Sequence, residues 1–246
     1  FGWRATFLVV SALGTLALIG SALLVPNNLK QSKPATLSEQ MKVLVQPRLV
    51  LVYLMTILGY GGTFTAFTYL APILQEEAGF APSAISLIML VYGASVAVGN
   101  IYGGKLADKK GPIRALTIIF SALAIILFAL TFTMGSKVAA VITVLVWGAF
   151  AFGNVPGLQV YVVQLAEKFT PNAVDVASGL NIAAFNIGIA VGSILGGAIV
   201  DGMQLSDTAW IGAIISVAAL LVTRYSGYLD KRALSTANTA NNTTSA

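Results

Sequence analysis

The side chains in this chain that could do chemistry are amides and aromatic rings within long apolar stretches. Trp147 and Asn154 are seven residues apart, and Asn181 and Phe185 are four apart, so each pair would share one face of a helix. Amides hydrogen-bond a solute and rings pack against its apolar parts, which favours binding of an amphiphilic organic solute. The cavity candidates are Tyr60, Phe64, Tyr92, Asn100, Trp147, Asn154, Asn181 and Phe185. The alternative is ordinary helix packing, with amides bonded between helices and rings filling gaps.

Catalytic and metal chemistry have few candidates here. The chain contains no histidine and no cysteine, which removes the commonest general base, the commonest metal ligand and all thiol chemistry. No charged side chain lies in the middle of an apolar stretch, since Lys105, Asp201 and Arg224 all lie near stretch ends, where snorkelling suffices. We therefore expect no catalytic residue, no metal site and no cofactor.

Seven apolar stretches position these side chains, each long enough to cross ~30 Å of hydrocarbon at 1.5 Å per residue. They are Ala5–Val25, Leu49–Leu74, Ala84–Ala107, Ala115–Thr133, Val138–Val160, Val174–Val200 and Ala209–Tyr225. Charged residues make up 9% of the chain, against roughly 25% in soluble domains. The sequence predicts an all-α membrane protein with seven transmembrane helices.

The basic residues are distributed unevenly over the loops. If residues 27–47, 108–114, 167–172 and the C-terminal tail lie inside, that side holds 12 of the 14 Lys and Arg residues, including Arg48 and Lys105 at span ends. Only Arg4 and Lys137 remain outside. The positive-inside rule then predicts an outside N-terminus and a cytoplasmic C-terminus. The net charge of +5 reflects this topology, so we expect the lipid bilayer and no nucleic acid as a partner.

Polar segments divide the chain into four predicted parts. They are a helix at 1–25, a cytoplasmic basic linker at 26–48, a six-helix bundle at 49–232 and a disordered cytoplasmic tail at 233–246. Within the linker, Leu37–Val45 is a candidate amphipathic surface helix. The first stretch begins almost at Phe1 and is not a signal peptide. We interpret the chain as a fragment cut from a longer protein just before a transmembrane helix.

The strongest local motif is GKLADKKGPIR at residues 104–114. Gly104 permits close helix approach and Gly111 permits a tight reversal. Asp108, at a membrane edge, can pair with a neighbouring basic residue or lie against a helix N-terminus. The alternative is that the basic residues here are only topology signals.

This motif resembles the G-x-L-A-D-[RK]-x-G-[RK]-[RK] loop signature of the major facilitator superfamily. The matching positions are Gly104, Leu106, Ala107, Asp108, Lys109, Gly111 and Arg114. The sequence departs at Pro112 and Ile113, where the family usually has basic residues. The resemblance implies that Asp108 has its partner in another six-helix half. It also implies a conformational-switch loop formed by Gly104, Asp108, Lys109, Gly111 and Arg114.

Other segments agree with this resemblance. Residues 1–4 are similar to the outer start of the family's sixth helix, and 147–159 and 178–188 to its tenth and eleventh helices. The general residue pattern of these segments resembles the drug:proton antiporter branch of the family, and within it the arabinose-efflux-permease-like members. The resemblance implies the last helix of an N-terminal half followed by the six-helix C-terminal half of a 12-helix transporter.

The resemblance also implies a function. It is proton-coupled efflux of small organic solutes, such as sugars or drugs, by alternating access in a bacterial inner (plasma) membrane. A proton-coupled carrier needs an ionisable group within the membrane, which we expect in the missing half. The partners would be the solute, protons and that missing half, with the protein a monomer.

Two other classes of function stay open, although both have weaker support. A non-transporting receptor or scaffold is compatible with the sequence, but the loops are too short for a docking domain. For an intramembrane enzyme, the sequence offers no candidate residues for hydrolase or metal chemistry, so we expect no enzyme.

A glycine pattern predicts one helix contact. Gly188, Gly192 and Gly196 recur every four residues, which predicts close helix packing within the chain rather than a dimer face.

Overall fold

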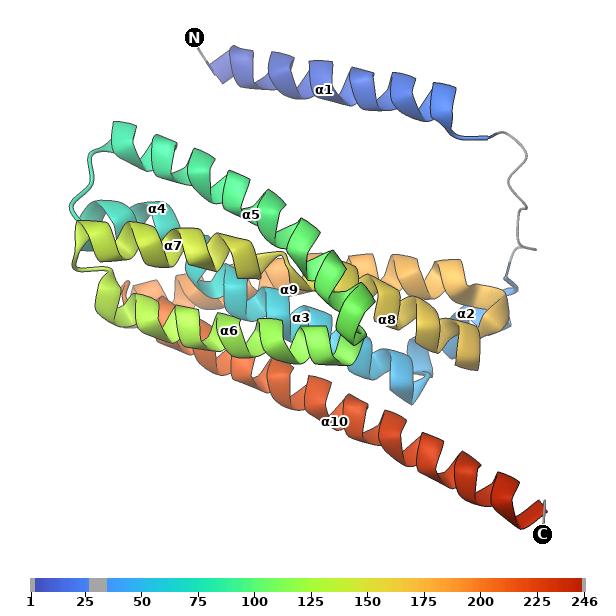
Figure 1. The fold of residues 1–246 in the computed structure, drawn as a ribbon. Coiled ribbons are helices and arrows are strands. Elements are labelled where there is room, and N and C mark those ends of the chain that lie inside the picture. Colours follow the sequence, from blue (N-terminus) through green and yellow to red (C-terminus); the bar gives the residue numbers. More distant parts are fainter. Residues whose placement is uncertain (1–2, 27–34, 245–246) are drawn as a thin grey trace. The chain divides into compact units, whose positions relative to one another are not determined.

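The computed structural model describes residues 3–26 and 35–244, and these residues are almost entirely helical (Figure 1). The helices are α1 (Trp3–Leu24), α2 (Leu37–Val45), α3 (Pro47–Phe67), α4 (Leu70–Pro72), η1 (Ile73–Glu77), α5 (Pro82–Lys110), α6 (Pro112–Thr133), α7 (Lys137–Ala151), α8 (Asn154–Phe169), η2 (Pro171–Ala173), α9 (Val174–Gly202) and α10 (Asp207–Thr244). In this described part, seven helical segments are long and apolar enough to cross a membrane. The predicted all-α membrane protein with seven spans is therefore confirmed.

Contacts divide the chain into two compact units, residues 1–34 and 35–246. The first unit contains α1, a single span-length apolar helix. The second contains α2 and the remaining six spans. The predicted linker falls partly on residues 27–34, which lie outside the described residues.

Helix α3 is central to the second unit because it packs closely against both α9 and α10. Glycines make these approaches possible. A Cβ built on Gly62 would lie 2.6 Å from the Gly212 carbonyl oxygen of α10, and one built on Gly188 would lie 2.7 Å from the Ile57 carbonyl oxygen of α3. Since side chains cannot fit at such distances, glycine at these positions sets the spacing of the three helices.

The predicted glycine face of α9 lies against α3. Gly188, Gly192 and Gly196 are buried, and each has a backbone oxygen of α3 where a Cβ would stand. At Gly192 that oxygen belongs to Gly61, and at Gly196 it belongs to Thr65. The face is thus occupied within the chain.

Helix α2 coincides with the amphipathic segment expected at Leu37–Val45. A capping box starts it, because Thr36 accepts a hydrogen bond from the Glu39 backbone and Glu39 accepts one from the Thr36 backbone. Asn172 of η2 also donates to Glu39 at 2.8 Å. The hydrogen bonds from Thr36 and then from Asn172 hold the pKa of Glu39 below its ordinary value. These contacts attach α2 to the loop between α8 and α9.

The C-terminal segment differs from expectation. Its composition predicts disorder from residue 233, whereas α10 continues to Thr244. Neither glycine nor proline follows Gly227, so nothing in the sequence stops the helix. The Thr236 hydroxyl donates to the Arg232 carbonyl oxygen at 3.1 Å and so bonds within the helix.

Candidate functional site

Seven aromatic rings from four spans form one cluster inside the second unit. They are Tyr60, Phe64 and Phe67 of α3, Tyr92 of α5, Trp147 and Phe152 at the end of α7, and Phe185 of α9. Tyr60 lies 4.5 Å from Phe185 between ring centroids, with the rings nearly perpendicular. At the other side of the cluster Phe67 stacks on Tyr92 at 5.2 Å. The cluster therefore holds five of the predicted cavity residues.

Several polar atoms in and near this cluster have no hydrogen-bond partner within the described residues. They are the Tyr92 hydroxyl, Trp147 Nε1, Asn154 Oδ1 and the Thr63 hydroxyl. Tyr92 is 3% exposed, and Trp147 and Asn154 are 0% exposed. Burying a polar group without a hydrogen-bond partner reduces the stability of the fold by roughly 1–3 kcal/mol. Such groups are rare in folded proteins, so their presence here calls for a functional or structural explanation. Apolar groups enclose these donors and this acceptor, and such a mixture of groups is typical of sites that bind polar organic molecules.

Asn181 lies in a different environment. Its Oδ1 accepts a 2.7 Å hydrogen bond from Thr56 of α3, and its Nδ2 donates to Gln159 of α8 at 3.0 Å. Gln159 in turn donates to Ser178. This chain of bonds ties α3, α8 and α9 together, so Asn181 acts as a link between helices. Asn100 is half-buried on α5, and no side-chain hydrogen bond in the described structure joins it to the cluster.

The predicted switch loop is a one-residue break between α5 and α6. Gly111 forms it with φ +79° and ψ 156°, a backbone conformation that is essentially restricted to glycine. Gly104 packs on Pro156 of α8, where a Cβ would be 3.7 Å from the proline ring. Asp108, Lys109 and Arg114 are exposed, and Asp108 makes no ion pair within the described part of the chain. The ion pair with a neighbouring basic residue that the sequence allowed for Asp108 is therefore not formed, and its carboxylate is available at the surface.

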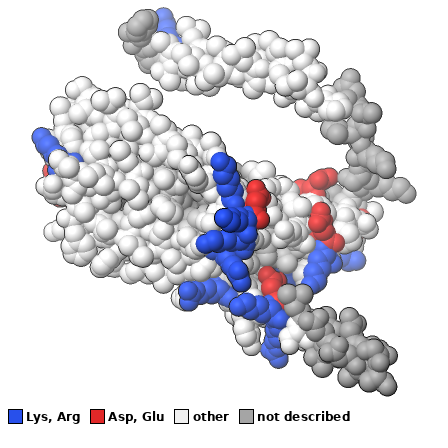
Figure 2. Space-filling view, in the orientation of Figure 1, with Lys and Arg blue, Asp and Glu red and all other residues white. Residues whose placement is uncertain are grey.

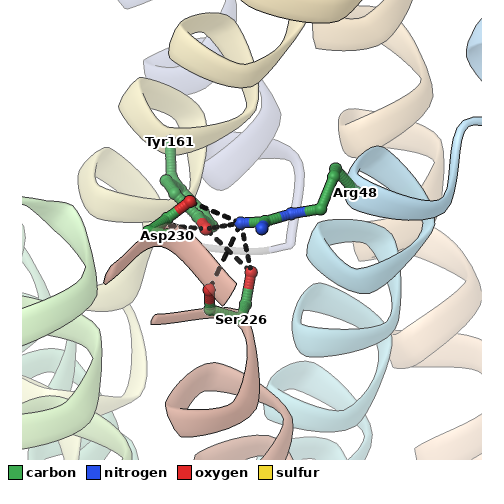
Figure 3. Close-up of polar contacts among 4 residues, drawn as sticks. All are labelled: Arg48, Tyr161, Ser226 and Asp230. Atoms are coloured by element: carbon green, nitrogen blue, oxygen red, sulfur yellow. Dashed lines mark hydrogen bonds and ion pairs between the residues drawn. The ribbon is translucent and has the colours of Figure 1, made fainter. Parts of the chain in front are cut away.

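A second polar cluster was not predicted from the sequence (Figure 3). Arg48 Nη2 of α3 lies 2.5 Å from Asp230 Oδ1 of α10 and donates to the Tyr161 hydroxyl of α8 at 3.0 Å. Tyr161 donates to the other Asp230 oxygen at 2.8 Å, and the Ser226 carbonyl oxygen accepts from Arg48 at 3.2 Å. We call this the Arg48–Asp230 cluster. It joins three spans at the membrane end where α3 begins and α10 leaves.

The sequence contains one weak signal for this cluster. Ser226 and Asp230 are four residues apart and would share a helix face. Their partner, however, lies 182 residues away from Asp230 in the chain. In the sequence, Arg48 is only one of several basic residues near span ends, and nothing about it indicates a partner on α10.

Comparison with known proteins decides the family. Residues 1–170 match the sequence profile of the Major Facilitator Superfamily. The chain belongs to the Major Facilitator Superfamily. YtbD, an MFS-type transporter of Bacillus subtilis (strain 168), is 51% identical over 232 residues, which cover 94% of this chain and 58% of YtbD. YdhP, an inner membrane transport protein of Escherichia coli (strain K12), is 33% identical over 224 residues, covering 90% of this chain and 56% of YdhP.

The superfamily fold appears in solved structures as well. The Escherichia coli fucose:proton symporter FucP superposes with a TM-score of 0.69 at 14% identity, over 91% of this chain and 55% of FucP. At this identity the likeness concerns the fold alone. The chain spans about half the length of the curated relatives it matches. The two relatives are named as a transporter and as a transport protein, and the solved structure is that of a symporter.

Proposed function

We propose that this chain is the C-terminal part of a proton-coupled transporter that exports small organic solutes, such as sugars or drugs. The observation that carries the proposal is the aromatic cluster with its polar atoms that lack partners. Tyr92 offers a hydroxyl, Trp147 an N–H donor and Asn154 an amide oxygen. A solute with an apolar face and a few hydroxyl or amino groups would satisfy all three.

Alternating access provides the mechanism. In transporters built from two helical bundles, the solute binds at their interface and one bundle rocks against the other. Residues 49–232 would be one such bundle and residues 1–25 the last helix of the other. Residues 26–48 would link them in the cytoplasm, and residues 233–246 would follow as the cytoplasmic end. The 58% coverage of YtbD supports a second bundle outside this chain.

Proton coupling would depend on that second bundle. Within the described spans, the Asp, Glu, Lys and Arg side chains lie toward the span ends, as the Arg48–Asp230 cluster does. A carboxylate that binds and releases protons during transport must lie within the membrane. We therefore assign the coupling group to the other half and the solute-facing rings to this half. A bacterial inner membrane, with an outside N-terminus and cytoplasmic C-terminus, agrees with the basic-residue distribution.

Replacing Tyr92 with phenylalanine tests the solute site. In the full-length protein we expect Tyr92→Phe to raise KM for the transported solute about 3- to 10-fold, the value of one lost neutral hydrogen bond. The same change should leave stability unchanged or raise it, because it removes a buried hydroxyl that has no protein partner. The measurement is saturable uptake into proteoliposomes, first with ethidium and L-arabinose as probes, together with thermal unfolding in detergent.

Tyr225→Phe is the matched control because this tyrosine is exposed on α10, away from the cluster. It should change neither KM nor stability. If Tyr92→Phe lowered stability and left KM unchanged, the hydroxyl would have a structural role, and the cluster would not be the solute site.

A further inference from the structure

Four basic side chains gather where α6 begins and α10 leaves the membrane. They are Lys110, Arg114, Arg224 and Lys231. They line two adjoining cavities of about 270 and 320 Å³ that share Ile113, Arg114, Gly227 and Lys231. We call the two cavities together the basic groove. Figure 2 shows basic side chains concentrated toward this end of the second unit.

The floor of the groove is a close contact between the two helices. A Cβ built on Gly227 would lie 2.7 Å from Ile113 Cγ2, so the absence of a side chain lets α10 approach α6. The Thr117 hydroxyl donates to the Ile113 carbonyl oxygen at 2.7 Å and is already engaged. The polar character of the groove therefore comes from its cations and from the other polar side chains that line it, which are Tyr161, Gln164, Tyr228 and Asp230.

The groove carries a net positive charge that the protein does not neutralise. Its only carboxylate among the lining residues is Asp230, which pairs with Arg48 and accepts a hydrogen bond from Tyr161. Arg114, Arg224 and Lys231 are exposed and have neither ion pair nor hydrogen bond to another described residue. Uncompensated cations that converge on one groove attract an anion.

The position of the groove selects the kind of anion. The spans begin at Pro112 on α6 and end at Ala233 on α10, so Lys110, Arg114 and Lys231 lie at the membrane edge and Arg224 lies further inside the α10 span. One turn deeper, Ile118 of α6 and Leu221 of α10 expose apolar side chains. Tyr225 and Tyr228 lie between Arg224 and Lys231 on α10 and are also exposed, as is typical of aromatic residues at a membrane interface. A ligand in the groove would therefore contact the cations with its polar end and apolar side chains with the part that extends deeper into the membrane.

We propose that the basic groove binds the phosphate of an anionic glycerophospholipid, with its acyl chains along α6 and α10. Arginine pairs with phosphate oxygens in a fork geometry, and lysine adds a point charge. Basic pockets between spans at a membrane face suit such headgroups. The proposal requires only that the second unit spans a membrane, so it is independent of the solute and of the coupling ion.

The test compares lipid binding by two double variants of the purified chain in neutral detergent. Arg224→Gln with Lys231→Gln removes two groove cations, and Lys105→Gln with Lys168→Gln removes two exposed cations that do not line the groove. Native mass spectrometry with added phosphatidylglycerol or phosphatidylcholine gives apparent Kd values. We expect the groove variant to bind phosphatidylglycerol about 25-fold more weakly, since each basic side chain contributes roughly a five-fold factor. The control variant should bind it as the unaltered chain does.

Three further results decide the proposal. A charge-retaining variant, Arg224→Lys with Lys231→Arg, should keep its preference for phosphatidylglycerol, and this separates binding from a folding defect. Equal weakening in both double variants would reduce the effect to general charge attraction and overturn the proposal. Displacement of phosphatidylglycerol by inorganic phosphate at comparable concentration would identify a soluble-anion site and would also overturn it.

Discussion

Replacing Gly192 with alanine is expected to destabilise the helical bundle by about 1–3 kcal/mol, the usual cost of forcing an extra group into a packed core. The added methyl group would collide with the Gly61 carbonyl oxygen of α3. Both positions are helix backbone, so neither can rotate away. Helices α3 and α9 would have to separate, which would also weaken the bonds that Asn181 makes to Thr56 and Gln159.

Gly179→Ala is the matched control because it lies on the same helix with open space where its Cβ would stand. There, alanine should stabilise by about 0.5–1 kcal/mol, since glycine is the poorer helix former. Both substitutions replace glycine with alanine, yet we expect changes of opposite sign in the free energy of unfolding. Circular dichroism during thermal or denaturant unfolding in detergent measures both. If Gly192→Ala stabilised the protein as much as Gly179→Ala, the close α3–α9 contact would be contradicted.

Asp108→Asn in the full-length protein is expected to reduce solute flux at least about tenfold, which corresponds to roughly 1.4 kcal/mol of coupling. Asp108 is exposed at the end of α5 and has no ion-pair partner in the described part of this chain. Under the proposed function its partner belongs to the other bundle, and the carboxylate biases which packing of the two bundles is favoured. The folding of this half should be unaffected, so the unfolding midpoint of the isolated chain should not move.

Glu167→Gln provides the control for Asp108. It removes another exposed carboxylate, near the end of α8, outside the switch loop. Flux with Glu167→Gln should match the unaltered protein. Normal flux with Asp108→Asn would reduce residues 104–114 to a topology signal. A loss of folding in the isolated chain would instead indicate a structural role for Asp108 within this half.

The seven spans were predictable because their signal is local. A run of about 20 apolar residues predicts a membrane helix by its length. Small residues at every fourth position predict a close contact between helices. The partner of such a contact is not local, so the glycine face of α9 did not identify α3. The rings of Tyr60, Trp147 and Phe185, which the sequence assigns to one cavity, lie in one aromatic cluster. Their role in lining a solute cavity stays a prediction.

Other features depend on tertiary structure that the sequence pattern does not encode. Phe152 joins the aromatic cluster because the α7–α8 span breaks beside it, and an aromatic residue there looks like any apolar residue. The Arg48–Asp230 cluster joins the first and last helices of the bundle, so neither residue indicates the other. Asn181 and Asn154 look equivalent in sequence, yet only Asn181 has neighbours that satisfy both ends of its amide.

Proton-driven flux tests the proposed division of the transporter most directly. The measurement compares residues 1–246 alone with the same chain co-reconstituted with the proposed N-terminal half, in liposomes with an imposed proton gradient. Because alternating access needs two bundles around one site, the proposed function predicts no saturable flux from the chain alone and gradient-dependent flux when both halves are present. Saturable, gradient-driven flux from residues 1–246 alone would contradict it.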